Sequence, residues 1–224
     1  IQIPVRLRIG LSLLLALIFL PLELGTGNSQ HLTNALDVLL AIFNELLVGI
    51  ILGFVAMLVF HGIQFAAFMV GLQMGFGMDQ VVDPTSGQQL TSLSIFLTLI
   101  ATVTFLLLDG HHWLLLALAH SLQVVPPGSF ILEDRILSKI LGATNELFFI
   151  VFALMLPILG ILLLVELALA IMNRMMPQMN IFVTGFPTKI GVGFLTLILG
   201  LPLIVAYFGD LFTRLARQLI TFFG

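Results

Sequence analysis

The stretch from Asn34 to Gly75 limits what this chain can fold into more than any other feature. It consists almost entirely of apolar, helix-forming residues, and it is roughly twice as long as one crossing of a bilayer requires. His61, Gly62 and Gln64 interrupt it midway. We therefore expect the chain to break or fold back within this stretch.

Composition places the whole chain in an apolar environment. Of the 224 residues, 60% are apolar and 8% are charged, and the mean hydropathy is +1.21, whereas soluble domains carry about a quarter charged residues. Helices of this kind need lipid or other apolar subunits around them. Eight basic residues and a net charge of −3 provide no stripe that could neutralise a nucleic-acid backbone, so DNA and RNA are not expected partners. Cysteine is absent, which excludes disulfides and thiolate chemistry.

Further apolar runs predict an all-α fold of membrane-type helical hairpins without a sheet. The two longest, separated by a connector from Met175 to Pro187, are expected to form an antiparallel hairpin, and Pro157 is expected to kink the first of them. No linker rich in Ser, Gly or Pro divides the chain, so residues 1–224 are expected to be a single domain. The predicted helical runs are Ile9–Leu22, Leu93–Leu108, Trp113–Leu122, Ile136–Met172 and Lys189–Thr221.

Two local patterns suggest function. The segment from Gly75 to Ser92 is polar, glycine-rich and long, which is typical of a functional loop. In the preceding helical run, Ala41, Glu45, Gly49 and Gly53 recur every four residues and form one stripe that suits close helix packing.

Several charges lie in or beside apolar helix and would be costly to bury without partners. Ion pairs within or between subunits are the favoured interpretation, and a proton or ion relay is the alternative. The residues concerned are Glu45, Glu146, Glu166, Arg174 and Lys189.

Enzymatic patterns are weak. Asp79 and Asp83 are four residues apart in the glycine-rich loop, but the preceding residues do not match an intramembrane aspartyl protease motif, and Asp83 before Pro84 is typical of a turn. Asp109, His111, His112 and His120 could be imagined as metal ligands. A helix end at a membrane interface, with Trp113 as an aromatic anchor, explains the histidines more simply. We expect no catalytic residue, no metal and no cofactor.

Two longer segments resemble the signature regions of the FliR family of flagellar type III export proteins. They are Gly71–Gly87 (GLQMGFGMDQVVDPTSG) and Arg174–Gly191 (RMMPQMNIFVTGFPTKIG). Glu45–Phe54 (ELLVGIILGF) is similar to a third family stretch, and Asp109–Trp113 with Pro126–Ser129 follow in the family order.

The resemblance implies one subunit of a hetero-oligomeric helical ring. Its partners would be FliP-like and FliQ-like gate subunits, an FlhB-like subunit, other export-apparatus and rod proteins, unfolded flagellar substrates and membrane lipid. The location would be the bacterial inner membrane, in the flagellar basal body. It also implies a FliP-like N-terminal half (about 1–130), a FliQ-like C-terminal hairpin (about 131–224), and a further family helix before the segment similar to Ile3–Leu24.

The resemblance assigns roles to two groups of residues. The glycine-rich loop would be a plug in the pore, with Gly75, Phe76, Gly77, Met78, Val81, Val82, Asp83, Pro84 and Gly87 as its gating residues. Subunit contacts and structural charges would be provided by Glu45, Gly49, Gly53, Glu166, Arg174, Pro177, Gln178, Asn180, Phe182, Gly185, Pro187 and Lys189.

Other functions remain open at this stage. A self-contained secondary transporter or ion channel would also have broken helices and intramembrane charges, although no internal repeat is found. The related gate of a virulence injectisome is the second alternative.

Overall fold

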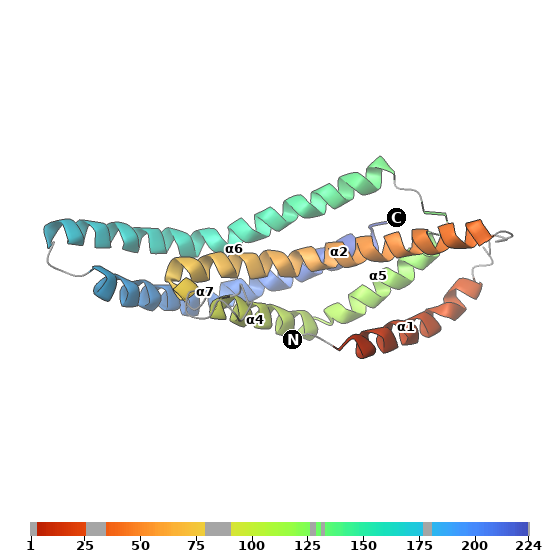
Figure 1. The fold of residues 1–224 in the computed structure, drawn as a ribbon, viewed down its shortest axis with the longest axis horizontal. Coiled ribbons are helices and arrows are strands. Elements are labelled where there is room, and N and C mark those ends of the chain that lie inside the picture. The colour runs from red at the N-terminus through yellow and green to blue at the C-terminus, as the bar shows by residue number, and fades with distance from the viewer. Residues whose placement is uncertain are drawn as a thin grey trace. The chain divides into compact units, whose positions relative to one another are not determined.

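The computed structural model describes residues 4–25, 35–78, 91–125, 129–130, 133–176 and 181–223, and not the side chains of residues 22–25, 78, 181 and 182. Within these ranges the regular structure is entirely helical, which confirms the all-α prediction (Figure 1). The α-helices are α1 (Val5–Gly25), α2 (Ala35–Met74), α4 (Ser92–Leu107), α5 (Gly110–Val124), α6 (Asp134–Met175) and α7 (Ile181–Ile220), and η1 (Phe76–Met78) is a short 3-10 helix.

Helix α2 corrects the first expectation. It is one continuous α-helix of 40 residues, about 60 Å long at 1.5 Å per residue, and it neither breaks nor folds back. The polar residues at its middle are accommodated inside the helix. His61 Nδ1 lies 2.9 Å from the Met57 carbonyl oxygen, and the absence of a side chain at Gly62 leaves room for Ile150 of α6.

Prolines also end fewer helices than the sequence suggested. Helix α1 continues through Pro21 to Gly25. Helix α7 begins at Ile181, so Gly185 and Pro187 lie inside it and not in a connector. Beside Pro187, the Thr188 hydroxyl donates to the Thr184 carbonyl oxygen (2.7 Å).

The hairpin of α6 and α7 is antiparallel, as predicted. Lys189, near the start of α7, contacts Glu166 in the second half of α6. Lys139, near the start of α6, donates to the carbonyl oxygens of Thr221 (2.8 Å) and Phe222 (2.6 Å) after the end of α7. Pro157 lies within the uninterrupted α6.

Three helices are long and apolar enough to cross a membrane, namely α2, α6 and the part of α7 from Val183 to Ile220. A fourth crossing is possible if α4 and α5 together count as one span. These two helices are separate because the chain turns at Leu108 and Asp109, where Asp109 has a φ of 54°. The structure is therefore that of a membrane-type helical protein.

The chain divides into two compact units. One comprises residues 1–55, 111–140 and 216–224, and it contains the buried face of the first half of α2, with Val48 and Val55. The other comprises residues 56–110 and 141–215, and it contains a core of Met74, Leu97, Leu162 and further apolar residues from α2, α4, α6 and α7.

Candidate functional site: the base of the loop between α2 and α4

The chain leaves α2 through a turn that only glycine adopts readily. Gly75 has a φ of +100°, and its N–H donates to the Leu72 carbonyl oxygen (3.0 Å). A left-handed glycine immediately after the last helical residue is a common way to end a helix. The following residues, Phe76–Met78, form η1.

Helix α7 packs against this turn. A Cβ at Gly75 would lie 2.7 Å from the Phe186 ring. The Phe76 ring meets the Phe194 ring edge-on, with 5.8 Å between the centroids. A Cβ at Gly193 would lie 2.8 Å from Met74 Cγ, and Met74 is fully buried. Two glycines therefore allow α7 and the end of α2 to come together.

The chain enters α4 beside the same turn of α2. Thr91 is buried, and its hydroxyl caps α4 by accepting a hydrogen bond from Ser94 N (3.2 Å). The Ser94 hydroxyl donates in return to the Thr91 carbonyl oxygen (2.7 Å). Thr91 lies directly against α2, where a Cβ at Gly71 would be 2.9 Å from Thr91 Cβ. The described residues on either side of the segment 79–90 thus lie close to the last turns of α2.

A carboxylate joins three helices close to this turn. Glu166 of α6 is ion-paired with Lys189 of α7 at 2.5 Å, and it accepts a second bond from Gln73 Nε2 of α2 at 3.2 Å. Lys189 is one helical turn from both Phe186 and Gly193. The structure thus places in contact two of the charges for which the sequence favoured ion pairs. We call Gly71, Gln73–Phe76, Thr91, Glu166, Phe186, Lys189, Gly193 and Phe194 the loop base.

The Glu166 and Lys189 side chains should be measurably coupled. Because they are 50% and 23% exposed, we expect a coupling energy of about 0.5–1 kcal/mol in a double-mutant cycle of Glu166→Gln and Lys189→Met. The measurement is equilibrium unfolding of the four purified proteins in detergent. Arg174, exposed and without a partner among the described residues, provides the control pair. A cycle of Glu166→Gln with Arg174→Gln should give a coupling near zero, and equal couplings would contradict the assignment.

The loop base brings together some of the residues that the sequence predicted as functional. It contains Gly75, Phe76, Glu166 and Lys189. Gly185 is buried on α7, while Pro187 and Arg174 are exposed. Glu45, Gly49 and Gly53 belong to the other unit, and a Cβ at either glycine would have no neighbour within 4 Å among the described residues. The following predicted residues lie outside the described part, wholly or for their side chains: Met78, Val81, Val82, Asp83, Pro84, Gly87, Pro177, Gln178, Asn180 and Phe182.

Sequence reasoning missed several residues of the loop base. Thr91 could have been found, because a threonine directly before an apolar helical run is a capping signal. Gln73, Phe186, Gly193 and Phe194 carry no such signal, since their role depends on which helices meet.

The loop base has the character of a mechanical support. Its contacts are aromatic rings, close glycine approaches, a helix cap and one ion pair, and they join the end of α2 to the start of α4 and to α7. In the other unit, His111 and His112 are exposed at the start of α5, with ring centroids 4.3 Å apart. Asp79 and Asp83 lie outside the described residues.

Within the described residues, fold and loop base together define a helical protein of membrane type in which the end of α2, the start of α4 and parts of α6 and α7 meet. Residues 1–215 match the family model of bacterial export proteins, family 1. The chain therefore belongs to this family.

Relatives extend the comparison. The chain is 35% identical to the flagellar biosynthetic protein FliR of Pectobacterium carotovorum subsp. carotovorum, over 93% of this chain and 79% of the relative. It is 30% identical to the protein of the same name from Escherichia coli (strain K12), over 97% and 82%. It is 28% identical to the Yop proteins translocation protein T of Yersinia pestis, over 87% and 75%.

Proposed function

We propose that this protein is a subunit of the flagellar type III export gate and that it forms part of the closed pore and its plug. It assembles with FliP-like and FliQ-like subunits and with an FlhB-like subunit in the bacterial inner membrane, at the flagellar basal body. Unfolded flagellar proteins pass through the pore. The subunit makes and breaks no covalent bond.

One observation carries the proposal beyond family membership. The described residues that flank the segment 79–90 belong to the loop base, with Gly75 and Phe76 before the segment and Thr91 after it. A loop with fixed ends can change its course between them while the helices stay in place. In our proposal the segment from Gly75 to Gly87 excludes water and ions at rest, and an unfolded substrate displaces it.

The test is a deletion of Val81–Gly87 in the chain expressed with its gate partners. We expect the complex to assemble and the cell membrane to become permeable to ions, because the apolar residues that close the pore are removed. Ion leakage and export of flagellar proteins are measured in the same strains. Deletion of seven residues from another polar segment, Gly27–Thr33, is the matched control and should leave the gate tight.

An assembled, ion-tight gate after deletion of Val81–Gly87 would contradict the plug. The export of flagellar proteins by the same strain would then decide between two roles. Lost export would show that the loop is structurally required, and unchanged export would show that it is dispensable. Loss of assembly in both deletions would assign the two segments to folding and not to closure.

The relationship to the Yersinia protein supports a second candidate, a gate subunit of a virulence injectisome. Complementation separates the two. We expect the chain to restore motility to cells lacking their flagellar relative, and not secretion to cells lacking the injectisome relative. The reverse result would assign it to the injectisome.

A further inference from the structure

His61 and Gln64 lie in the interior of α2 and have no part in the loop base. The sequence predicted a helix break at this point, but α2 is one continuous helix of 40 residues. Gly62, which lies near them in the sequence, packs against Ile150 of α6. The break and the glycine are thus accounted for, and the two polar side chains are not.

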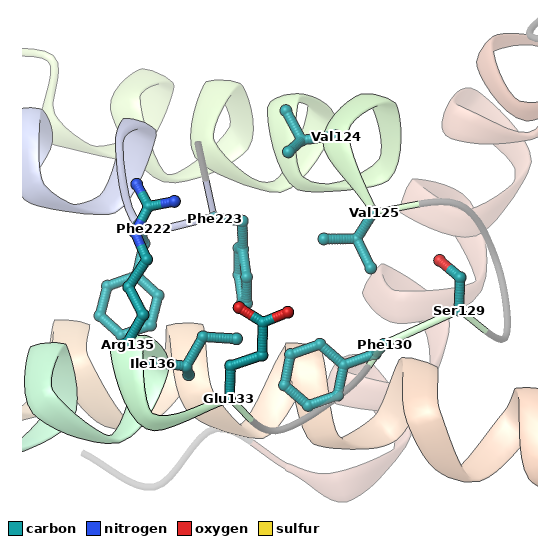
Figure 2. Close-up of a pocket in the computed structure, with 9 residues that line it drawn as sticks. All are labelled: Val124, Val125, Ser129, Phe130, Glu133, Arg135, Ile136, Phe222 and Phe223. Atoms are coloured by element: carbon teal, nitrogen blue, oxygen red, sulfur yellow. The ribbon is translucent and has the colours of Figure 1, made fainter.

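Polar side chains at helix ends are easily accommodated. Glu133 and Arg135, for example, line a cavity of about 200 Å³ in the first unit, where α5 ends and α6 begins (Figure 2). Such positions are typical of the membrane–water interface. His61, by contrast, is 26 residues after the first residue of α2 and 13 before its last, which places it about 20 Å from the nearer end. A polar residue this far inside an apolar helix usually has a specific partner.

The imidazole of His61 is held in one orientation by its own helix. Its Nδ1 lies 2.9 Å from the Met57 carbonyl oxygen. A carbonyl oxygen only accepts hydrogen bonds, so we assign the proton to Nδ1, and the neutral ring presents Nε2 as an acceptor. Within the described residues, Nε2 has no hydrogen-bond partner. The ring thus offers a lone pair to a donor from elsewhere.

The side-chain amide of Gln64 also lacks a partner. It makes no hydrogen bond to any described residue, although the side chain is partly buried. A primary amide has two N–H donors and a carbonyl acceptor. Helix α2 is apolar enough to cross a membrane, and in an apolar environment no water satisfies such a group. His61 and Gln64 are three residues apart, so they are neighbours on the helix surface.

Both side chains lie on the face of α2 that the chain leaves uncovered. With 3.6 residues per turn, they share this face with Met57, Phe65 and Leu72, which are 62%, 47% and 38% exposed. Ile63 and Val70, on the opposite face, are each 1% exposed. The uncovered face therefore combines large apolar side chains with an acceptor and an amide. We call Met57, His61, Gln64, Phe65 and Leu72 the outer patch.

The composition of the outer patch favours a protein helix as its partner. Acyl chains of lipids cover apolar side chains, but they cannot satisfy an imidazole nitrogen or an amide. Water would satisfy both polar groups, but it would leave Met57, Phe65 and Leu72 in contact with solvent. A helix of another subunit can satisfy both requirements, because polar side chains inside membranes hydrogen-bond across helices while apolar side chains pack around them.

We propose that the outer patch binds an apolar helix of another gate subunit and that this helix carries an asparagine or glutamine beside His61 and Gln64. The N–H of its amide donates to His61 Nε2, and its carbonyl oxygen accepts a hydrogen bond from the Gln64 amide. Neighbours at this spacing are about 5–6 Å apart at Cβ, and a carboxamide has separate donor and acceptor atoms with which to reach both. The inference rests on the proposed function, because it names a contact of the same assembly.

The first test measures binding of the fluorescently labelled full chain to its FliP-like and FliQ-like partners in detergent. The dissociation constant is compared among wild type, Gln64→Met and His61→Leu. We expect each variant to bind about three- to tenfold more weakly, because one hydrogen bond between helices is lost and its partner group is left unsatisfied. The isolated variants should unfold at the wild-type midpoint or above it, since Gln64 has no partner among the described residues and His61 bonds only its own helix.

Gln73→Met is the matched control for stability. Gln73 lies on the same helix as Gln64, but its amide donates to Glu166 within the chain (3.2 Å). This substitution should therefore lower the unfolding midpoint of the isolated chain, whereas Gln64→Met should not. The difference separates a contact between subunits from a contact within the chain.

Photo-crosslinking identifies the partner helix. A benzoylphenylalanine in place of Phe65, one turn from His61, is activated in the assembled gate, and the crosslinked peptide is sequenced by mass spectrometry. We expect a peptide of another gate subunit with an asparagine or glutamine within one helical turn of the crosslinked residue. Replacing that residue with methionine should add no further loss of affinity to Gln64→Met, because the same hydrogen bond is already lost.

Several results would overturn the inference. If the wild-type gate assembles and both Gln64→Met and His61→Leu bind as tightly as wild type, the hydrogen bonds do not exist, and the proposed function is unaffected. Crosslinks from position 65 only to lipid or to a second copy of this chain would exclude the proposed partner. Equal losses of stability for isolated Gln64→Met and Gln73→Met would make the contact internal. If the wild-type chain does not bind the gate partners, the proposed function fails together with the inference.

Discussion

Replacing Gly75 with alanine is expected to lower the free energy of unfolding by about 3 kcal/mol. The backbone contributes about 1–2 kcal/mol, because an L-residue is strained at a positive φ, and Gly75 has a φ of +100°. The steric part adds about 1 kcal/mol or more, since the new Cβ would lie 2.7 Å from the Phe186 ring. Equilibrium unfolding of the purified protein in detergent measures the sum.

Two further variants identify the origin of the loss. Gly75→Ala combined with Phe186→Ala removes the steric contact and keeps the backbone strain. Comparison with Phe186→Ala alone therefore isolates the cost of the positive φ. Gly191→Ala is the matched control, because a Cβ there has no neighbour within 4 Å among the described residues. At that position in α7, alanine should stabilise the helix by up to about 1 kcal/mol.

Gly75→Ala also tests the plug, because Gly75 sets the direction in which the chain leaves α2. If the proposed function is right, an assembled gate with this substitution should leak ions. A variant as stable as wild type would contradict the structural account. A gate that is destabilised but ion-tight would agree with the strained position of Gly75 and would contradict the proposed plug.

Replacing Phe212 with alanine is expected to cost about 2 kcal/mol. Phe212 is fully buried, and its ring lies 5.1 Å from the Phe105 ring and 5.3 Å from the Phe60 ring, between centroids. In a water-soluble core the substitution costs about 3–5 kcal/mol. Part of this cost is the free energy of transferring apolar surface from water, and most of that part disappears when the unfolded helices are still in lipid or detergent. The lost packing contacts remain, so we expect roughly half of the cost in a water-soluble core.

The measurement for Phe212 is again equilibrium unfolding in detergent. Phe212→Leu should cost less than Phe212→Ala because it leaves a smaller cavity. Leu203→Ala is the control, since Leu203 is 76% exposed and should change the stability by at most about 0.5 kcal/mol. Equal losses for Phe212→Ala and Leu203→Ala would show that the aromatic cluster is not a packed core in solution.

Much of the fold could be predicted from the sequence because it depends on local properties. The low content of charge and the long apolar runs required helices in an apolar environment, and a hairpin of α6 and α7 followed from two long runs and one connector. That the helix ends near Gly75 could be read from the glycine-rich, polar residues that follow. The resemblance to export proteins was based on two segments, Gly71–Gly87 and Arg174–Gly191.

Other features depended on tertiary structure. Whether α2 breaks at His61 and Gly62 could not be read locally, because Gly62 packs against Ile150 of α6, and that contact depends on how the helices meet. Pro187 seemed to end a connector, yet the helix continues through it from Ile181. The reason is that a proline removes one hydrogen bond and neighbouring groups can compensate for it.

The sequence by itself determined the helical class, the apolar environment and the position of the loop. Only the tertiary structure decided what holds that loop. Glu166 and Lys189 are 23 residues apart, and Gln73 is 93 residues from Glu166; their contact exists because α2, α6 and α7 meet at one place. Thr91 against Gly71, and Phe186 against Gly75, depend on the same meeting. Side-chain contacts between distant segments depend on how the helices pack, which local sequence patterns do not encode.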